Sequence, residues 1–219
     1  MKTWTPNIHS NTALNTAILA VVAVLTAALV GQLRDNMPST VTIRTTIERE
    51  HRGADTVAAL VTPRKRAKLL PCPHPGDGPG PAVLRGVVLE CASDGSAVDV
   101  ARALAGRRVV LNLWASWCAQ CLSEMPAVAE YQRRAGSDVT VVTVHQDENE
   151  TAALLRLTQL DVRLPTLQDG RRRVAAALRV ANVMPATVVL RPDGSVAQTL
   201  LRAFGSADEI AAAVGNDAG

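Results

Sequence analysis

Cys118 and Cys121 are the two residues of the sequence whose types and spacing point to the most specific chemistry. They follow Trp114-Ala-Ser-Trp117, where an apolar run gives way to a helical pattern. Cysteines three apart at a helix start share one face, close enough to form a disulfide, and the first is the more exposed. The helix N-terminus favours a thiolate on Cys118. The pattern therefore predicts thiol–disulfide exchange, with Cys118 attacking and Cys121 resolving the mixed disulfide.

Three other interpretations of this cysteine pair are weaker. A zinc site needs a second pair of ligands, and His145 is the only histidine after Cys121. A permanently closed structural disulfide would leave the strand-to-helix setting without a purpose. A peroxidatic Cys118 would want a hydroxyl to bind the peroxide three residues earlier, where the chain has Ala115. We therefore expect neither a metal nor any other cofactor.

The elements that must position the pair form an alternating pattern. Two near-continuous β-branched runs, Val109–Ala115 and Val139–His145, are typical of strands buried on both faces. Asp94-Gly95 and Pro192-Asp193-Gly194 are turn signals, so each predicts a β-hairpin. The remaining expected elements are helices at Ala119–Arg134, after Asp147 (a capping box with Glu150), Arg171–Val180 and Asp208–Val214, and a short strand at Arg163–Leu167. This order predicts an α/β fold with a mixed central sheet.

Over roughly residues 85–215 the sequence resembles the TlpA/ResA-type thioredoxin-like proteins, which are extracytoplasmic and membrane-anchored. The segments that carry the resemblance are Val110-Leu-Asn-Leu-Trp-Ala-Ser-Trp-Cys118, Glu124-Met-Pro126, and Val183-Met-Pro185-Ala-Thr187 followed by Asp193-Gly194. The resemblance implies a thioredoxin fold, a mixed central sheet flanked by helices with an N-terminal β-hairpin and a helical insertion between about 147 and 167. It also implies a cis Pro185 that faces the cysteines.

The resemblance assigns roles to further residues. Glu124 matches an acid of the family, and its spacing places it on the Cys121 face, where it could move a proton on or off that thiol. The alternative is a solvated glutamate favoured by the helix dipole. Asn112 stands where cytosolic thioredoxins carry a buried aspartate, which makes Glu124 the candidate substitute.

Substrate contacts are expected from Trp117, Met184 and Pro185. Gln120 replaces a proline that is common before the second cysteine, so the direction of exchange stays open. His145, at a strand end, could lie near the site, although a capping or solvated role is the simpler expectation.

The N-terminal third predicts a membrane attachment. Ala17–Val30 is apolar except for Thr26, and lacks a clear signal cleavage site. We expect a tail over 1–12, a transmembrane anchor over 13–33, a stalk over 34–81 with at most one amphipathic helix between Val41 and Leu60, and the thioredoxin-like domain over 82–216. A cleaved signal peptide, giving a secreted protein, and a buried core helix are the alternatives. The basic cluster 64–68 is expected to be solvated or to contact anionic lipid.

Cys72 lies near the start of the Pro/Gly-rich stretch 71–81, and Cys91 lies at the end of the first expected strand, so the two cysteines bracket both segments. A disulfide between them would tie this stretch to the domain and, by loop entropy, contribute about 3 kcal/mol. Buried free thiols are the alternative. Because structural disulfides persist in oxidising compartments, this bond would place the domain outside the cytoplasm.

Together these patterns predict an extracytoplasmic thiol–disulfide oxidoreductase. The leading hypothesis is a reductase of disulfides in envelope or secreted proteins, apocytochrome c among them, served by a membrane electron donor. A disulfide-forming oxidant and an anchored binding or chaperone module are the alternatives. The formal charge of +3, from 23 basic and 20 acidic residues, does not suggest nucleic-acid binding.

Overall fold

The structure is a computed structural model that describes residues 20–22, 24–26, 28, 32 and 55–215. The chain divides into two compact units, Met1–Arg49 and Glu50–Gly219, and all the elements named below belong to the second. Most of the expected anchor lies outside the described residues. Among the residues that the structure does describe, no helix is both long and apolar enough to cross a membrane.

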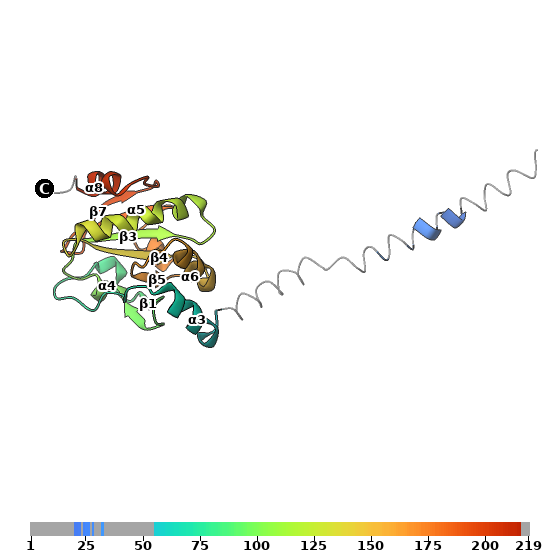
Figure 1. The fold of residues 1–219 in the computed structure, drawn as a ribbon, viewed down its shortest axis with the longest axis horizontal. Helices are drawn as coiled ribbons and strands as arrows, with labels where there is room; N and C mark the ends of the chain where they lie inside the picture. Colours follow the sequence, from blue (N-terminus) through green and yellow to red (C-terminus); the bar gives the residue numbers. More distant parts are fainter. Residues whose placement is uncertain (1–19, 23, 27, 29–31, 33–54, 216–219) are drawn as a thin grey trace, which may run out of the picture. The chain divides into compact units, whose positions relative to one another are not determined.

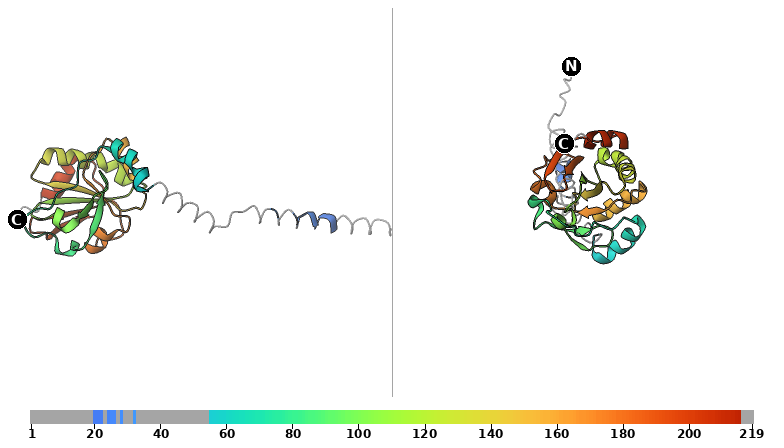
Figure 2. Two further views of the ribbon diagram at one scale, coloured as in Figure 1. Left: turned by 90° about the horizontal axis from the view of Figure 1, so that it is seen from below. Right: turned by 90° about the vertical axis from the view of Figure 1, so that its left-hand side faces the viewer.

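A seven-stranded mixed sheet forms the centre of the second unit (Figures 1 and 2). Its strands, in the spatial order β2-β1-β5-β4-β3-β6-β7, are β1 (Val88–Cys91), β2 (Ala97–Asp99), β3 (Val109–Trp114), β4 (Thr140–His145), β5 (Thr166–Gln168), β6 (Ala186–Leu190) and β7 (Val196–Leu200). Strands β3, β4 and β5 run parallel, and every other pairing is antiparallel. The carboxyl ends of β3 and β4 therefore meet at one edge of the sheet, where functional groups of α/β folds gather.

Helices cover both faces of the sheet. They are α3 (Val57–Ala67), the 3-10 turn η1 (Ala82–Leu84), α4 (Val100–Ala103), α5 (Ala119–Ala135), α6 (Glu150–Gln159), α7 (Arg173–Ala177) and α8 (Ala207–Gly215). Strand β3 alternates between two cores because successive side chains point to opposite faces. Val110 and Trp114 pack in the core with α5, α6 and α8, whereas Leu111 and Leu113 pack in the core with α4 and α7.

The sequence predicted most of these elements. Both hairpins, the two buried strands and the helix after Cys118 are confirmed, with ends that shift by at most one residue. The predicted third helix, Arg171–Val180, is shorter and spans only Arg173–Ala177. The helix after β4 begins at Glu150 and is capped by Asn149, whose side chain accepts the Ala152 N–H, so the predicted capping box from Asp147 is wrong.

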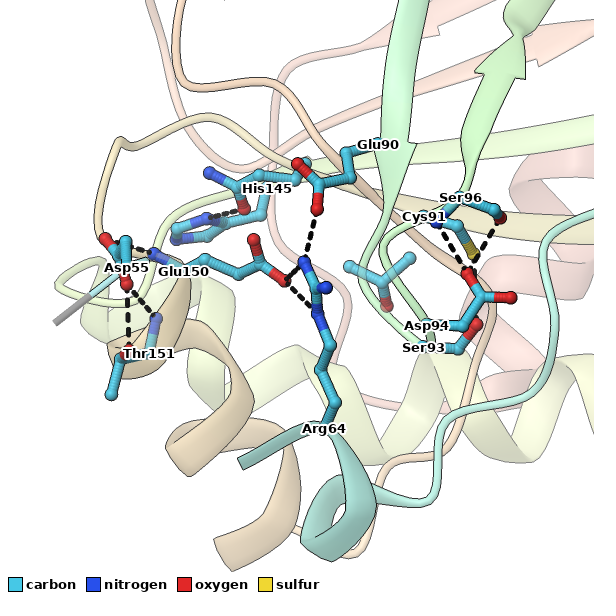
Figure 3. A network of polar contacts seen from close by, with 12 residues as sticks. Asp55, Arg64, Glu90, Cys91, Ser93, Asp94, Ser96, His145, Glu150 and Thr151 are labelled. Atoms are coloured by element: carbon cyan, nitrogen blue, oxygen red, sulfur yellow. Dashed lines mark hydrogen bonds and ion pairs between the residues drawn. The ribbon is translucent and has the colours of Figure 1, made fainter. Parts of the chain in front are cut away.

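The compact unit begins before residue 82, because α3 packs against α6. Arg64 is only 8% exposed and donates to Glu150, at 2.9 and 3.1 Å, and to Glu90 at 2.5 Å (Figure 3). Asp55 accepts the backbone N–H groups of Glu150 and Thr151 at the start of α6. The expectation that 55–67 is stalk and that Arg64 is solvated is therefore wrong. Buried charges of this kind are stable only when paired.

The Pro/Gly-rich stretch is also packed rather than free. A Cβ on Gly80 would lie 2.0 Å from the Ala101 carbonyl oxygen, and one on Gly76 would lie 2.3 Å from that of Ala105. The composition of this stretch suggested a linker. Instead, its glycines allow the backbone of the stretch to pack directly against the backbone at Ala101 and Ala105. The structure joins Cys72 to Cys91 by a disulfide with Cα atoms 5.9 Å apart, which fastens this stretch to β1.

Candidate functional site

Cys118 and Cys121 are joined by a disulfide at the start of α5, with Cα atoms 5.2 Å apart. Cys118 is the N-cap residue, and its Sγ accepts the Cys121 N–H at 3.2 Å. Cys118 is 8% exposed and Cys121 is fully buried. An unpaired N–H at a helix end stabilises negative charge, so this geometry favours a thiolate on Cys118 after reduction.

The residues expected to contact substrate flank this pair. Trp117 is 65% exposed, and its indole N–H donates to Asp147 Oδ2 at 3.2 Å. The Met184–Pro185 peptide bond is cis. Because Leu113 pairs with Ala186 across β3 and β6, Pro185 lies one step further along, where β3 leads into the cysteine loop. Met184 is partly buried against the core that contains both cysteines.

Glu124 is fully buried, on the same face of α5 as Cys121. Its Oε1 accepts from Asn112 Nδ2 at 2.7 Å, and its Oε2 accepts the Phe204 N–H at 3.0 Å. The alternative of a solvated first-turn glutamate is therefore wrong. The carboxyl group connects β3, α5 and the loop before α8 directly behind the buried cysteine.

Burial raises the pKa of Glu124 above its ordinary value of 4.5, and the two hydrogen bonds only partly oppose this effect. None of the described residues forms an ion pair with it. Asn112 Oδ1 is buried and accepts no hydrogen bond. If the Asn112 amide turned over, that oxygen could accept a hydrogen bond from the O–H of a neutral Glu124, so Asn112 can pair with either the ionised or the neutral acid. A buried acid with a raised pKa suits proton transfer near neutral pH.

His145 is the site residue whose role the sequence least suggested. Its imidazole is fully buried, so the solvated role is wrong. Its ring centre is 4.9 Å from that of Trp114, and its Nε2 accepts the Ser116 N–H at 3.3 Å. Its Nδ1 lies 2.9 Å from Gln168 Oε1 on β5. Its position at the end of a strand neighbouring β3 was the signal in the sequence.

The profile of the family described as Redoxin matches residues 77–214, well over half of the chain. The chain belongs to the Redoxin family. Its thioredoxin-like domain is of the TlpA/ResA type.

Curated relatives and solved structures agree with this assignment. The redoxin domain is similar to the thiol-disulfide oxidoreductase ResA of Bacillus subtilis, 31% identical over 98 residues, which are 44% of this chain and 54% of ResA. The chain thus spans about half the length of the curated relatives it matches.

Among solved structures, it is similar to a secreted Mycobacterium tuberculosis disulfide oxidoreductase homologous to E. coli DsbE. The identity is 25% and the TM-score 0.54, over 61% of this chain and 97% of that one. It is also similar to a DsbF homologue from Corynebacterium diphtheriae, at 27% identity and a TM-score of 0.52, over 59% of this chain and 83% of that one.

The other chemistry considered for the cysteines was metal binding. Within the described part of the chain, no group of three or more His, Cys, Asp or Glu side chains is arranged to hold a metal ion. All four cysteines are in disulfides. The redoxin domain therefore has one helix-capping cysteine that keeps a small exposed fraction and a partner cysteine that is fully buried, and that arrangement suits disulfide exchange.

Proposed function

We propose that this chain is a thiol–disulfide oxidoreductase that reduces disulfides in envelope or secreted proteins. The observation that carries the proposal is the Cys118–Cys121 pair, in which the capping sulfur is the accessible one and the helix end favours its thiolate. The relatives named as thiol-disulfide oxidoreductases support it.

In the reducing direction the Cys118 thiolate attacks one sulfur of the substrate disulfide, and the other substrate sulfur leaves as a thiolate. Cys121 then attacks Cys118 Sγ, which releases the second substrate sulfur. Two electrons pass from the dithiol to the substrate, which takes up two protons, and the Cys118–Cys121 disulfide remains. Glu124 receives the Cys121 proton as that thiol becomes the nucleophile. Trp117, Met184 and Pro185 form the substrate contacts around the Cys118 sulfur.

The proposed setting is the outside of the cell membrane. Residues 13–33 hold the chain in the membrane as a single pass, and a membrane electron donor restores the dithiol. The Cys72–Cys91 disulfide supports an oxidising compartment, and the similar M. tuberculosis protein is described as secreted. Secretion after cleavage is the alternative. Apocytochrome c is one candidate among the substrates.

A disulfide-forming oxidant is the second candidate, favoured by Gln120 between the cysteines, where the family commonly has proline. Titration of the purified full chain against a graded redox buffer, with the Cys118–Cys121 peptide followed by mass spectrometry, separates the two. A potential near about −270 mV supports a reductant, and one near about −120 mV supports an oxidant. If the wild-type chain exchanges disulfides no faster than a Cys118→Ser variant, neither candidate stands, and a non-enzymatic binding module becomes the better explanation.

A further inference from the structure

His145 lies at the centre of a hydrogen-bonded chain that ends on the cysteine loop. Gln168 Oε1 faces His145 Nδ1, and Gln168 Nε2 donates to the Asp147 carbonyl at 2.6 Å. Because the Gln168 oxygen is an acceptor, Nδ1 must carry the imidazole proton, and Nε2 is left as an acceptor. That acceptor receives the Ser116 N–H, two residues before Cys118.

Asp147 and Gln146, which follow His145, also hydrogen-bond to the residues before Cys118. Its Oδ2 accepts the indole N–H of Trp117, and the backbone N–H of Gln146 donates to the Trp114 carbonyl at 2.8 Å. Thus both residues that immediately precede Cys118 are held from β4 and the segment after it: Ser116 through its backbone by His145 at the end of β4, and Trp117 through its side chain by Asp147. The cysteine loop has no helix or strand of its own over Ala115–Trp117, so these contacts set its position.

We propose that His145 is a positioning residue for Cys118, and that its neutral Nδ1–H tautomer holds the cysteine loop in the reactive conformation. The inference rests on the proposed exchange at Cys118. Protonation would put a donor on Nε2 facing the Ser116 N–H, and two donors cannot bond to each other. The loop would then shift, and the site would lose reactivity in acid.

The surroundings of the imidazole agree with a neutral group. Burial lowers its pKa from the ordinary 6.5, while the Gln168 hydrogen bond and the charges of Asp147 and Asp55 oppose this effect. Figure 3 shows His145 together with Asp55, Glu90 and Glu150, and the two glutamates are paired with Arg64. Cys118 and Cys121 are the titratable residues of the cysteine loop and of the first turn of α5.

The test compares two substitutions of His145 in the full chain. In His145→Gln, the amide oxygen can take the place of Nε2 and accept the Ser116 N–H without titrating, whereas His145→Leu leaves that N–H unpaired. The measurement is the rate at which iodoacetamide alkylates Cys118 in selectively reduced protein between about pH 5 and 8, with folding checked by circular dichroism. His74→Gln, at an exposed histidine, is the matched control.

We expect His145→Leu to slow alkylation by about tenfold at neutral pH, the cost of leaving one buried donor unpaired. His145→Gln should match the wild type at neutral pH and exceed it below the pKa of His145, because only the wild type gains the opposing proton. Gln168→Glu supplies a second measurement if the leucine variant fails to fold. A carboxylate facing Nδ1 raises the imidazole pKa, so the acid loss should move to higher pH.

The two hypotheses fail in different ways. If Cys118 reacts normally but all three variants follow the wild-type pH profile, His145 is a core residue with no effect on the site, and the proposed function stands. If Cys118 is never preferentially alkylated, or exchange persists in Cys118→Ser, the proposed function falls first. A uniform slowing by His145→Gln and His145→Leu alike would also overturn the inference, since it indicates a packing role.

Discussion

Glu124→Gln separates the proposed proton-transfer role of this buried acid from its structural role. The glutamine keeps the shape of the side chain, and its carbonyl can accept the Phe204 N–H. The bond from Asn112 Nδ2 is lost, but once the Asn112 amide turns over, the glutamine amide can donate to Asn112 Oδ1. Both neighbours then keep a hydrogen bond to residue 124, and the titration is lost. We expect the exchange rate to fall by up to about 10²-fold, which is about 2.7 kcal/mol of barrier.

Glu124→Gln should slow exchange but raise the free energy of unfolding at neutral pH. The pKa of Glu124 in the folded protein lies above its ordinary value of 4.5. Between the unfolded-state pKa and the folded-state pKa, the folded protein therefore binds more protons than the unfolded chain, and its stability falls as the pH rises through that window. Glu124→Gln removes this loss, so the variant should be more stable than the wild type at neutral pH and similar to it in acid. Glu124→Ala instead strands two buried donors, at about 1–3 kcal/mol each, and should destabilise by about 2–6 kcal/mol.

The assay is disulfide exchange by the full chain from about pH 5 to 9, together with urea denaturation of both variants at each end of that range. The result that refutes the reasoning is a Glu124→Gln variant with the wild-type rate throughout and an unmoved Cys121 titration. In that case the proton leaves Cys121 directly to water. A rate loss accompanied by lower stability at neutral pH would mean that the carboxylate is needed for structure.

Three further outcomes are expected. Brief iodoacetamide treatment of the reduced protein should label Cys118 and spare the fully buried Cys121; mass mapping that finds the reverse contradicts the assignment of the nucleophile. Graded dithiothreitol should reduce the Cys118–Cys121 disulfide before the Cys72–Cys91 disulfide, because only the Cys118 thiolate is stabilised by a helix N-terminus. Peptide mapping that finds Cys72 and Cys91 free first would contradict this order. Arg64→Ala should lower the free energy of unfolding, measured by urea denaturation, by about 3–5 kcal/mol, because the buried Glu150 carboxylate loses its cation. Lys65→Ala, at an exposed neighbour, is the control and should change the stability little.

Local patterns in the sequence predicted what local physics determines. The hairpins at Asp94-Gly95 and Asp193-Gly194 follow from turn chemistry, and the cysteine pair follows from its position between a buried strand and a helix. The burial of Glu124 could not be read from spacing alone, because its partner Phe204 lies 80 residues further along the chain.

Long-range pairing hid the rest. Asp55 reaches the start of α6 across 95 residues, and Arg64 reaches Glu150 across 86, so the polar composition of this stretch looked like solvated stalk. His145 meets Gln168 only because β4 and β5 are neighbours in the sheet. Hydrophobic periodicity predicts which face of a helix or strand is buried, but it does not predict which polar group from a distant part of the chain contacts that face.

The Cys72–Cys91 disulfide would have a mechanical consequence if residues 13–33 tether the domain as proposed. Tension entering at residue 55 would act first on α3, which is attached by buried Leu60 and Ala67 and by the Arg64 ion pairs. Once α3 had peeled away, the load would reach Cys72 and cross directly to β1 through the disulfide. The bond spans 19 residues, so about 65 Å of chain is withheld from extension. Force would reach β1 at the sheet without unravelling the Pro/Gly-rich stretch, and the cysteine loop on β3 would be protected from the pull.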